Sequence, residues 1–432
     1  MMKNSGRTRG LTAALAVALA LLLATEASAV QGAIDKLKQF GGTGDDVVEG
    51  IVAGKFSYLA GHTSGIIAGT ETNAGGVDGW VRKQRGGGRK VWVHQFGTGG
   101  DDNVYGVATG GGVYVVGSTS GTLPGQNSGG GTDAFVRKYK ADGTEAWTRQ
   151  FGSNQTDIAT DVSVDAAGDV YVVGHTAGSV KPGTPNTGLN DFFVRKYTLA
   201  GNVAWTQQVG SIDAGDDMAL AVAVDGTGVY VAGRTSGDLP GQDPEGGVDA
   251  FMRKYTLAGA IVANWFKQFG TAADDQILDI DIDGTNLAVA GDTTGTFPGQ
   301  PVKAGLDAWT RLYNTDGVKI WTRQMGSLLD DAGTAVRVDS NGVTLAAWTE
   351  GEFGLFSNQG GEDVILRTWT LAGSGADQLL LQWGEAGDDR PLALDGTAAY
   401  LLTAGQTSGK IVGTASNLGG LDAWWGKILL TV

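Results

Sequence analysis

The sequence predicts an all-β fold, a seven-bladed β-propeller of four-stranded antiparallel blades. A unit of 55 to 60 residues recurs along the chain, and each unit contains four short runs of β-branched and aromatic residues. The two ends of the chain also complement each other as parts of one sheet. Such repeats override the two or three domains that a length of 432 residues would otherwise suggest.

A Gln-x-Gly junction, with an aromatic residue usually in the middle, marks each unit. The spacing between successive Gln residues lies between 55 and 60, which is typical of one supersecondary unit with loops of variable length. The seven junctions are Gln39-Phe40-Gly41, Gln95-Phe96-Gly97, Gln150-Phe151-Gly152, Gln208-Val209-Gly210, Gln268-Phe269-Gly270, Gln324-Met325-Gly326 and Gln382-Trp383-Gly384.

The second unit shows the four expected strands most clearly. They cover Val104–Ala108, Val113–Ser118, Ala134–Tyr139 and Glu145–Phe151. Asp142-Gly143 separates the last two, and an Asp-Gly pair supplies the positive φ angles that a tight hairpin needs.

The chain ends predict a closed ring rather than an open solenoid. The last unit runs through a third strand, Ala423–Leu430, and has no fourth one. Ile34–Phe40, near the N-terminus, reads as a fourth strand with no preceding three, although Lys36 stands where other units usually have Trp. Pairing the two segments completes seven blades and removes the exposed sheet edges.

The repeat resembles the bacterial SBBP (seven-bladed beta propeller) repeat family. The similarity rests on Gln-Phe-Gly-x-x-x-Asp-Asp, Val-Tyr-Val-Val-Gly-x-Thr-Ser-Gly, Asp-Ala-Phe-Val-Arg-Lys-Tyr and Ala-Trp-Thr-Arg, and residues 95–149 match best. The resemblance implies an exported bacterial propeller. It implies no reaction, because propellers carry many unrelated functions.

Residues 1–29 read as a cleaved signal peptide, and residues 30–432 as one propeller domain. Basic residues precede an apolar run, Leu11–Ala24, that is too short to span a bilayer, and Ala27-Ser28-Ala29 forms a small-x-small cleavage site. No later segment is apolar enough to span a membrane. We therefore expect a secreted protein, located in the periplasm, at the cell surface or outside the cell.

Composition limits the partners. The chain has a net charge of −15, to which the signal peptide contributes +2, so the mature protein carries −17. This charge disfavours nucleic acid and favours cationic partners, including Ca²⁺. The absence of Cys excludes disulfides and thiolate metal sites.

A pair of Asp residues follows six of the seven junctions, and in the third unit Thr156 replaces the first Asp and only Asp157 remains. One hypothesis is a ring of carboxylates that binds Ca²⁺ through oxygen ligands; the other, which uniform repetition favours, is that Asp bonds loop N–H groups and locks blade to blade. No cofactor is otherwise required. The residues are Asp45, Asp46, Asp101, Asp102, Asp157, Asp216, Asp217, Asp274, Asp275, Asp330, Asp331, Asp388 and Asp389.

A second Asp precedes each third strand, with an apolar residue two positions later and usually Arg four positions later. The period of two places the three side chains on one face, which we expect to press on a neighbouring blade, with Arg paired to a repeated Asp. Gly426 replaces Arg in the last unit, so its seam should differ. The Asp residues are Asp78, Asp133, Asp191, Asp249, Asp307, Asp363 and Asp422, and the Arg residues are Arg82, Arg137, Arg195, Arg253, Arg311 and Arg367.

One position varies while its neighbours repeat. It lies at the end of the second strand, directly before a Thr present in every unit. Relaxed surface drift would produce such variation, but so would a ligand-binding surface at one mouth of the propeller. The residues are His62, Ser118, His175, Arg234, Asp292, Trp348 and Gln406.

The sequence favours binding over catalysis. It contains no Gly-x-Ser-x-Gly, Walker or His-Glu-x-x-His motif, and only three His residues. The leading hypothesis is an exported interaction scaffold that binds a glycan, peptide or extracellular matrix component through one mouth. The alternatives are a calcium-dependent structural component of a surface layer or matrix, and a polysaccharide-acting enzyme.

Overall fold

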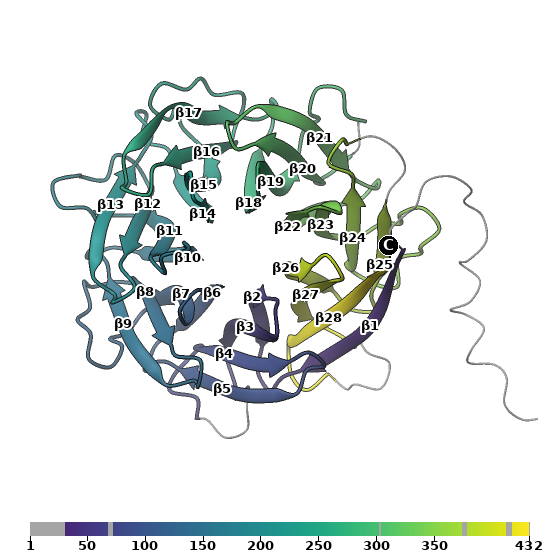
Figure 1. The fold of residues 1–432 in the computed structure, drawn as a ribbon, viewed down its shortest axis with the longest axis horizontal. Coiled ribbons are helices and arrows are strands. Elements are labelled where there is room, and N and C mark those ends of the chain that lie inside the picture. Colours follow the sequence, from purple (N-terminus) through teal and green to yellow (C-terminus); the bar gives the residue numbers. More distant parts are fainter. Residues whose placement is uncertain (1–30, 68–71, 302–303, 374–377, 412–416, 432) are drawn as a thin grey trace, which may run out of the picture.

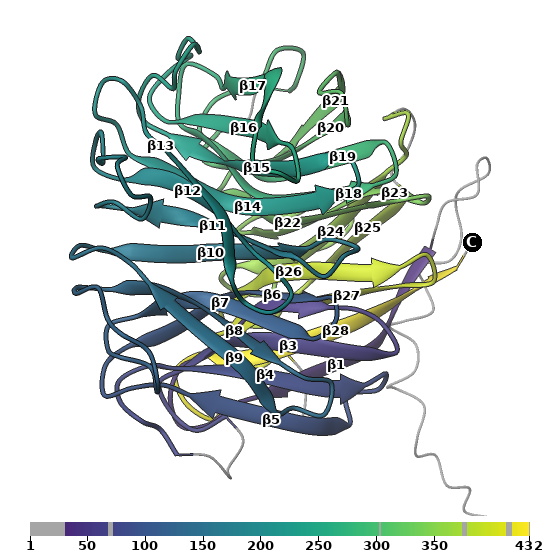
Figure 2. The same cartoon turned by 60° about the vertical axis from the view of Figure 1, so that its left-hand side comes forward.

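The computed structural model describes residues 31–67, 72–301, 304–373, 378–411 and 417–431. These residues form seven four-stranded antiparallel sheets, arranged as blades around a central opening (Figure 1). Seen from the side, the strands run across the thickness of a disc and successive blades lie one above another across its width (Figure 2). The described residues contain no helix, and so none that is long and apolar enough to cross a bilayer. The predicted fold class is confirmed.

Each blade runs from the central opening outward in chain order. Blades 1 to 6 are β2–β5, β6–β9, β10–β13, β14–β17, β18–β21 and β22–β25, and blade 7 is β26, β27, β28 and β1. The innermost strands are β2 (Asp46–Val52), β6 (Asp102–Thr109), β10 (Asp157–Val164), β14 (Asp217–Asp225), β18 (Asp275–Asp283), β22 (Asp331–Asp339) and β26 (Asp389–Thr397). The second strands are β3 (Phe56–Thr63), β7 (Val113–Thr119), β11 (Val170–Thr176), β15 (Gly228–Thr235), β19 (Asn286–Thr293), β23 (Gly342–Thr349) and β27 (Tyr400–Thr407).

The outer two strands of each blade complete the sheets. The third strands are β4 (Asp78–Arg85), β8 (Asp133–Tyr139), β12 (Asp191–Tyr197), β16 (Asp249–Tyr255), β20 (Asp307–Asn314), β24 (Asp363–Trp369) and β28 (Asp422–Thr431). The outermost strands are β5 (Lys90–Phe96), β9 (Glu145–Phe151), β13 (Val203–Val209), β17 (Ile261–Phe269), β21 (Lys319–Met325), β25 (Leu379–Trp383) and β1 (Gln31–Phe40).

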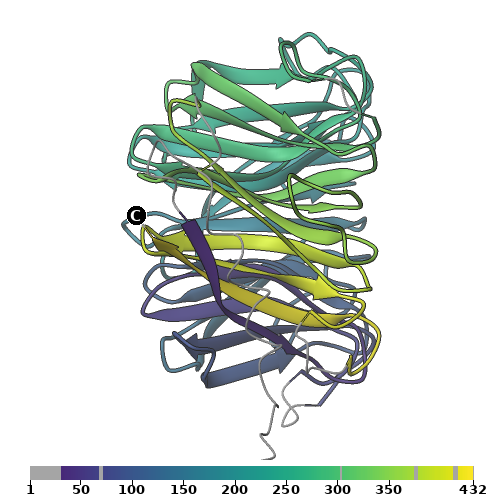
Figure 3. The same cartoon turned by 90° about the vertical axis from the view of Figure 1, so that its right-hand side faces the viewer.

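The ring closes as predicted, through β1. This strand pairs antiparallel with β28, from Phe40 opposite Ala423 to Gln31 opposite Thr431. Figure 3 shows the purple β1 lying beside the yellow strands of blade 7. Closure therefore joins the start of the described chain to its end.

The hydrophobic core lies between neighbouring blades. We call the interface between two neighbouring blades a seam. Here the expected pairing of Arg with Asp is wrong. The Arg137 guanidinium lies over the Phe96 ring of the preceding blade, 4.1 Å from its centroid, and its Nε donates to Thr148 Oγ1 at 2.9 Å. A guanidinium on an aromatic face keeps its charge stabilised while its flat surface fills the core. Asp133 instead accepts a hydrogen bond from Gln150.

The seam before blade 7 differs, as Gly426 predicts. Trp383 packs edge-on against Trp424 at a centroid distance of 6.3 Å, as Phe96 packs against Phe135, but no guanidinium can extend from Gly426 over the Trp383 ring as Arg137 does over Phe96. The signal peptide prediction concerns residues 1–29, which lie outside the described residues.

Candidate functional site

One face of the disc gathers the ends of the second strands and the starts of the innermost strands; we call it the mouth. The backbone itself ties these segments together. At blade 2 the Ser120 N–H, just after β7, donates to the carbonyl of Asp101, just before β6, at 2.9 Å. Equivalent bonds occur in the other six blades, so the variable positions and the Asp pairs share this face.

The second Asp of each pair is buried and holds its own loop. Asp157 accepts hydrogen bonds from the Ser153 N–H at 2.6 Å, from Ser153 Oγ at 3.0 Å and from Thr176 Oγ1. All seven equivalents accept a loop N–H in the same way. Burial raises the pKa of these carboxyls, to about 6 at Asp389.

The first Asp of the pair links one blade to the preceding one. Asp101 Oδ1 accepts the Val77 N–H, across the seam, at 3.0 Å. The observed bonds are therefore those of the structural hypothesis for the Asp pairs. Among the described residues, no group of three or more His, Asp or Glu side chains is arranged to hold a metal ion. Calcium binding stays a prediction.

The hydrogen bonds of the junction Gln explain why this Gln and the Asp before the third strand both occur in every unit. Gln150 Nε2 donates to Asp133 Oδ2 at 2.8 Å and to the Gly121 carbonyl at 2.9 Å, while its Oε1 accepts the Leu123 N–H at 2.9 Å. The Gln–Asp pair recurs in all seven blades. A Cβ on Gly152 would lie 2.1 Å from Asp133 Oδ1, so the junction also requires glycine.

The variable positions lie between the second strand of one blade and the start of the next blade, and they fall into local groups. His62 forms an edge contact with Tyr105 at a centroid distance of 6.3 Å, and its Nδ1 lies 3.8 Å from Glu49 Oε1. Tyr105 in turn hydrogen-bonds Ser118, so two variable positions meet at the seam of blades 1 and 2. Burial lowers the pKa of His62.

A second group spans blades 3 to 5. Arg234 Nη1 contacts Gln276 Oε1 at 3.4 Å, and Gln276 Nε2 donates to both oxygens of Asp292 at 3.0 and 3.1 Å. Burial lowers the pKa of His175 to about 4, and the Arg234 charge acts in the same direction. Burial also raises the pKa of Asp292 to about 6.

The third group lies at blades 6 and 7. The Arg390 guanidinium sits 5.1 Å from the centroid of the Trp348 ring and is paired with the buried Glu362. Gln406 pairs with Arg390 across β26 and β27. The structure therefore brings the seven variable positions to one mouth, but in separate groups rather than as one cluster.

The lining of the central channel was not predicted from the sequence. Each innermost strand contains a β-bulge three residues after its first Asp, where one residue is skipped in the pairing with the second strand. A bulge re-aims a side chain, and all seven bulge residues line a channel cavity of about 360 Å³. They are Glu49, Tyr105, Thr160, Leu220, Leu278, Thr334 and Leu392.

Carboxylates in the channel bind the free edge of neighbouring strands. Asp161 accepts the Val222 N–H of the next blade at 2.8 Å, and Asp279 accepts the Val336 N–H at 2.8 Å. Burial raises the pKa of both groups to about 7, although these hydrogen bonds oppose the shift. Burial also raises the pKa of Glu49, at the channel wall, to about 7.

One repeat matches a known family model. Residues 146–180 match the model described as SBBP, a beta-propeller repeat. These residues therefore carry a match to the SBBP beta-propeller repeat. The resemblance inferred from the junction and strand motifs is thus confirmed, with four-stranded blades in a ring of seven.

Among curated proteins, the chain is similar to the regulatory protein FlaEY of Caulobacter vibrioides. The two are 31% identical over 214 residues, which is 46% of this chain and 22% of FlaEY. The match thus spans about a fifth of the relative's length.

Some solved structures are similar at low sequence identity. The phage phi92 endosialidase has a TM-score of 0.42 and 7% identity, with 92% of this chain and 70% of that chain covered. A PL25 ulvan lyase has a TM-score of 0.46 and 12% identity, with 89% and 97% covered.

Proposed function

We propose that this protein is an exported interaction scaffold that binds a glycan, a peptide or an extracellular matrix component through the mouth. The observation that carries the proposal is the contrast between fixed and varied positions on this face. The junction Gln with its Asp partner, and the buried second Asp of each pair, recur in every blade, whereas the variable positions beside them include imidazole, guanidinium, carboxylate and indole groups. Varied side chains on a rigid scaffold are typical of a binding surface.

The arrangement suits a polar ligand with some apolar surface. Trp348 and Tyr105 offer aromatic faces, while Arg234 and Asp292 offer charged hydrogen-bonding groups on other blades. A ligand that spans several blades would contact more than one of these groups. Export is supported by the signal peptide that the sequence predicts.

Binding is tested by probing residues 30–432 against glycan and peptide arrays. Trp348→Ala and Arg234→Ala should each weaken the strongest hit by at least tenfold, because aromatic and Arg contacts dominate most binding surfaces. Val203→Ala, on the exposed outer strand β13, is the control and should bind like the unaltered protein. Unchanged binding in both mouth variants would eliminate the mouth as the site.

A polysaccharide-acting enzyme is the second candidate, and one feature favours it. Glu49, His62 and Tyr105 meet where the channel opens into the mouth, and a carboxyl whose pKa is near neutrality is suited to acid–base chemistry. Turnover of an array hit that is lost in Glu49→Gln while binding is kept would support catalysis. Binding with no turnover leaves the scaffold as the function.

A further inference from the structure

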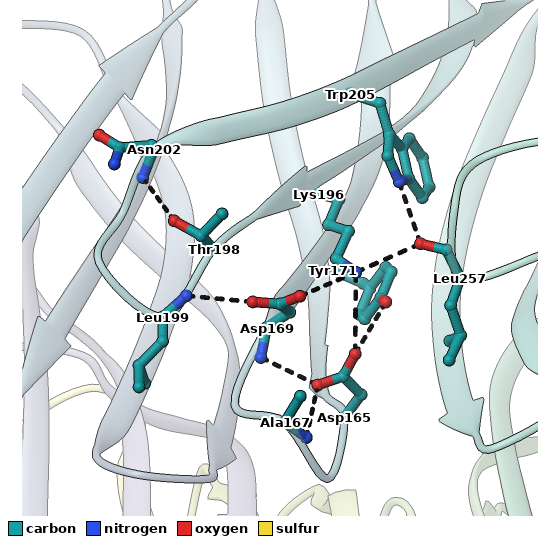
Figure 4. A network of polar contacts seen from close by, with 10 residues as sticks. All are labelled: Asp165, Ala167, Asp169, Tyr171, Lys196, Thr198, Leu199, Asn202, Trp205 and Leu257. Atoms are coloured by element: carbon teal, nitrogen blue, oxygen red, sulfur yellow. Dashed lines mark hydrogen bonds and ion pairs between the residues drawn. The ribbon is translucent and has the colours of Figure 1, made fainter.

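The face opposite the mouth is held by an aromatic clamp at regular seams. At the seam of blades 3 and 4, Trp205 Nε1 and Lys196 Nζ both donate to the Leu257 carbonyl of the next blade, each at 3.2 Å (Figure 4). The Trp205 ring also packs against Tyr255, at a centroid distance of 6.4 Å. Two large rings and a lysine thus fill this end of the seam.

The same clamp recurs at other seams. Trp and Lys donate together to one carbonyl at the seams of blades 1 and 2, 2 and 3, and 4 and 5. The carbonyl lies in the turn between the third and outermost strands of the next blade. It belongs to Ala141, Leu199 and Thr315 respectively.

The closure seam, between blades 7 and 1, lacks this clamp. Lys36 of β1 occupies the Trp position opposite Lys427, as Trp205 does opposite Lys196. On the facing blade, Ser57 and Gln84 form the cross-strand pair for which blade 3 has Val170 and Tyr197. The equivalent pairs in the other blades are Val113–Tyr139, Val229–Tyr255, Leu287–Tyr313, Val343–Trp369 and Leu401–Ile428.

A pocket of about 180 Å³ lies where the clamp is missing. Trp425 of β28 fills only part of the vacated space, because it is buried against the turn at Gly88 rather than extending from the outermost strand. A single water needs only about 15 Å³ of such space, so the pocket has room for one small molecule. Its side-chain lining comes from Ser57, Gln84, Arg85, Tyr400, Leu402, Trp425 and Lys427.

The Ser57–Gln84 pair places polar side chains in the pocket at positions where every other blade has an apolar or aromatic pair. Gln84 is 1% exposed, and its Oε1 has no hydrogen-bond partner among the described residues. A buried acceptor without a partner destabilises the fold, and a bound donor would remove that penalty. Arg85 and Lys427 add two positive charges, and the Asp35 carboxylate lies 3.7 Å from Lys427.

We propose that this pocket binds one sugar-acid ring, a hexuronate or the terminal uronate of an acidic polysaccharide. A ring hydroxyl would donate to Gln84 Oε1, the carboxylate would face Lys427 and Arg85, and the apolar ring face would lie against Trp425 and Tyr400. The site is distinct from the mouth and does not depend on the function proposed there. A bound ring would bridge blades 7 and 1, so it would also stabilise the closed propeller.

The probe is D-glucuronate, titrated by calorimetry into residues 30–432, with D-glucose and inorganic phosphate as comparisons. We expect saturable binding of one glucuronate per chain and a rise in Tm. Glucose, which lacks the carboxylate, should bind at least tenfold more weakly. A short oligouronide that binds more tightly than the free sugar would identify a polysaccharide end as the natural source. Phosphate that binds as tightly as glucuronate would overturn the proposal, because the pocket would then bind any small anion.

Two variants test the residues. Gln84→Leu installs an apolar residue as in the other blades, and Lys427→Met removes a charge; each should weaken glucuronate binding at least tenfold. Lys319→Met, an exposed lysine of blade 5, is the charge-matched control. Trp348→Ala should leave glucuronate binding unchanged, which separates this site from the mouth. Absence of saturable glucuronate binding would refute the proposal. So would Gln84→Leu and Lys427→Met variants that both bind glucuronate as tightly as the unaltered protein.

Discussion

The regular seam of blades 3 and 4 and the closure seam of blades 7 and 1 agree at the mouth and differ at the opposite face. At the mouth, both carry a backbone bond across the seam, from Asp217 to Asn190 at 2.9 Å and from Asp46 to Leu421 at 2.7 Å. In the channel, Asp395 accepts the Ala53 N–H of blade 1 at 2.7 Å, as Asp161 does for blade 4. Only the aromatic clamp is absent from the closure seam.

This difference shows which contacts closure requires. Gln39 of β1 repeats the full junction pattern, since it donates to Asp422 at 2.7 Å and to the Gly409 carbonyl at 3.0 Å and accepts the Ile411 N–H at 3.1 Å. Lys36, three residues before Gln39 along β1, is free of that pattern. Closure therefore depends on the residues of β1 that lie near the mouth. Residues at the other end of β1 can differ in chemical type from their equivalents in the other blades.

Deletion of residues 31–40 should have the largest effect. It exposes the edge of β28 and leaves the buried Asp422 without its Gln39 partner, so we expect loss of the cooperative unfolding transition or oligomers formed through the open edge. Size-exclusion chromatography and urea unfolding measure both results. A synthetic peptide of residues 31–41 should restore the transition. A deletion variant that stays monomeric and as stable as the parent would contradict closure by β1.

Loss of a clamp residue should matter at the regular seam and hardly at the closure seam. Trp205→Ala removes a large ring and the bond to Leu257, and should lower the free energy of unfolding by about 3 kcal/mol. Lys36→Ala removes no clamp contact and should change it by less than about 0.5 kcal/mol. Urea unfolding of both variants measures the contrast. Equal losses would show that Lys36 replaces the clamp energetically.

Acidic pH should stabilise both seams through the channel carboxyls. Burial raises the pKa of Asp161 to about 7 in the folded state, above its unfolded value, so the folded protein binds more protons between pH 4 and 7. Stability from this group is present at low pH and is lost as pH rises through 7. Asp395 has a raised pKa for the same reason. Urea midpoints should therefore fall from pH 5 to pH 8.

Variants of the channel carboxyls test whether these groups cause the pH dependence of stability. Asp161→Asn and Asp395→Asn should each flatten the slope, because at both seams a buried channel carboxyl with a raised pKa accepts an N–H of the next blade. Asp243→Asn, in an exposed loop, should keep the parental slope. A slope that both channel variants leave unchanged would assign the effect to other carboxyls.

The smallest expected effect is that of calcium. The second Asp of each pair already accepts a hydrogen bond from a loop N–H, at the closure seam as elsewhere. Thermal melts with Ca²⁺ and with a chelator should therefore overlay. A shift of several degrees would support the calcium-dependent alternative instead.

The sequence was sufficient to predict the seven blades and their closure, because both follow from repeated motifs and from the two ends of the chain. It also placed the variable positions at one mouth. It did not reveal the channel lining, because the bulge at Glu49 and its equivalents breaks the period-two alternation from which orientation is inferred. The Arg137–Phe96 contact was missed because strand alternation identifies a face but not the group that the next blade presents to it.

The closure pocket was hidden for a related reason. Lys36 was visible as a departure from Trp, but it lies almost 400 residues from Lys427, its partner across the sheet. Only the register of β1 against β28, together with the Ser57–Gln84 pair of blade 1, places the three polar substitutions at one seam. A position-by-position comparison of the units shows that these three residues are unusual. It does not show that they lie at the same seam.

Hydrogen exchange tests the central claim, that β1 is an integral strand of blade 7, most directly. Amides of residues 36–40 should exchange within about tenfold of those in β13, the equivalent strand of blade 3, because both strands open with their blades. Exchange of residues 36–40 at the rate of an unstructured peptide, with β13 protected, would contradict closure by β1 and remove the basis for the pocket beside it.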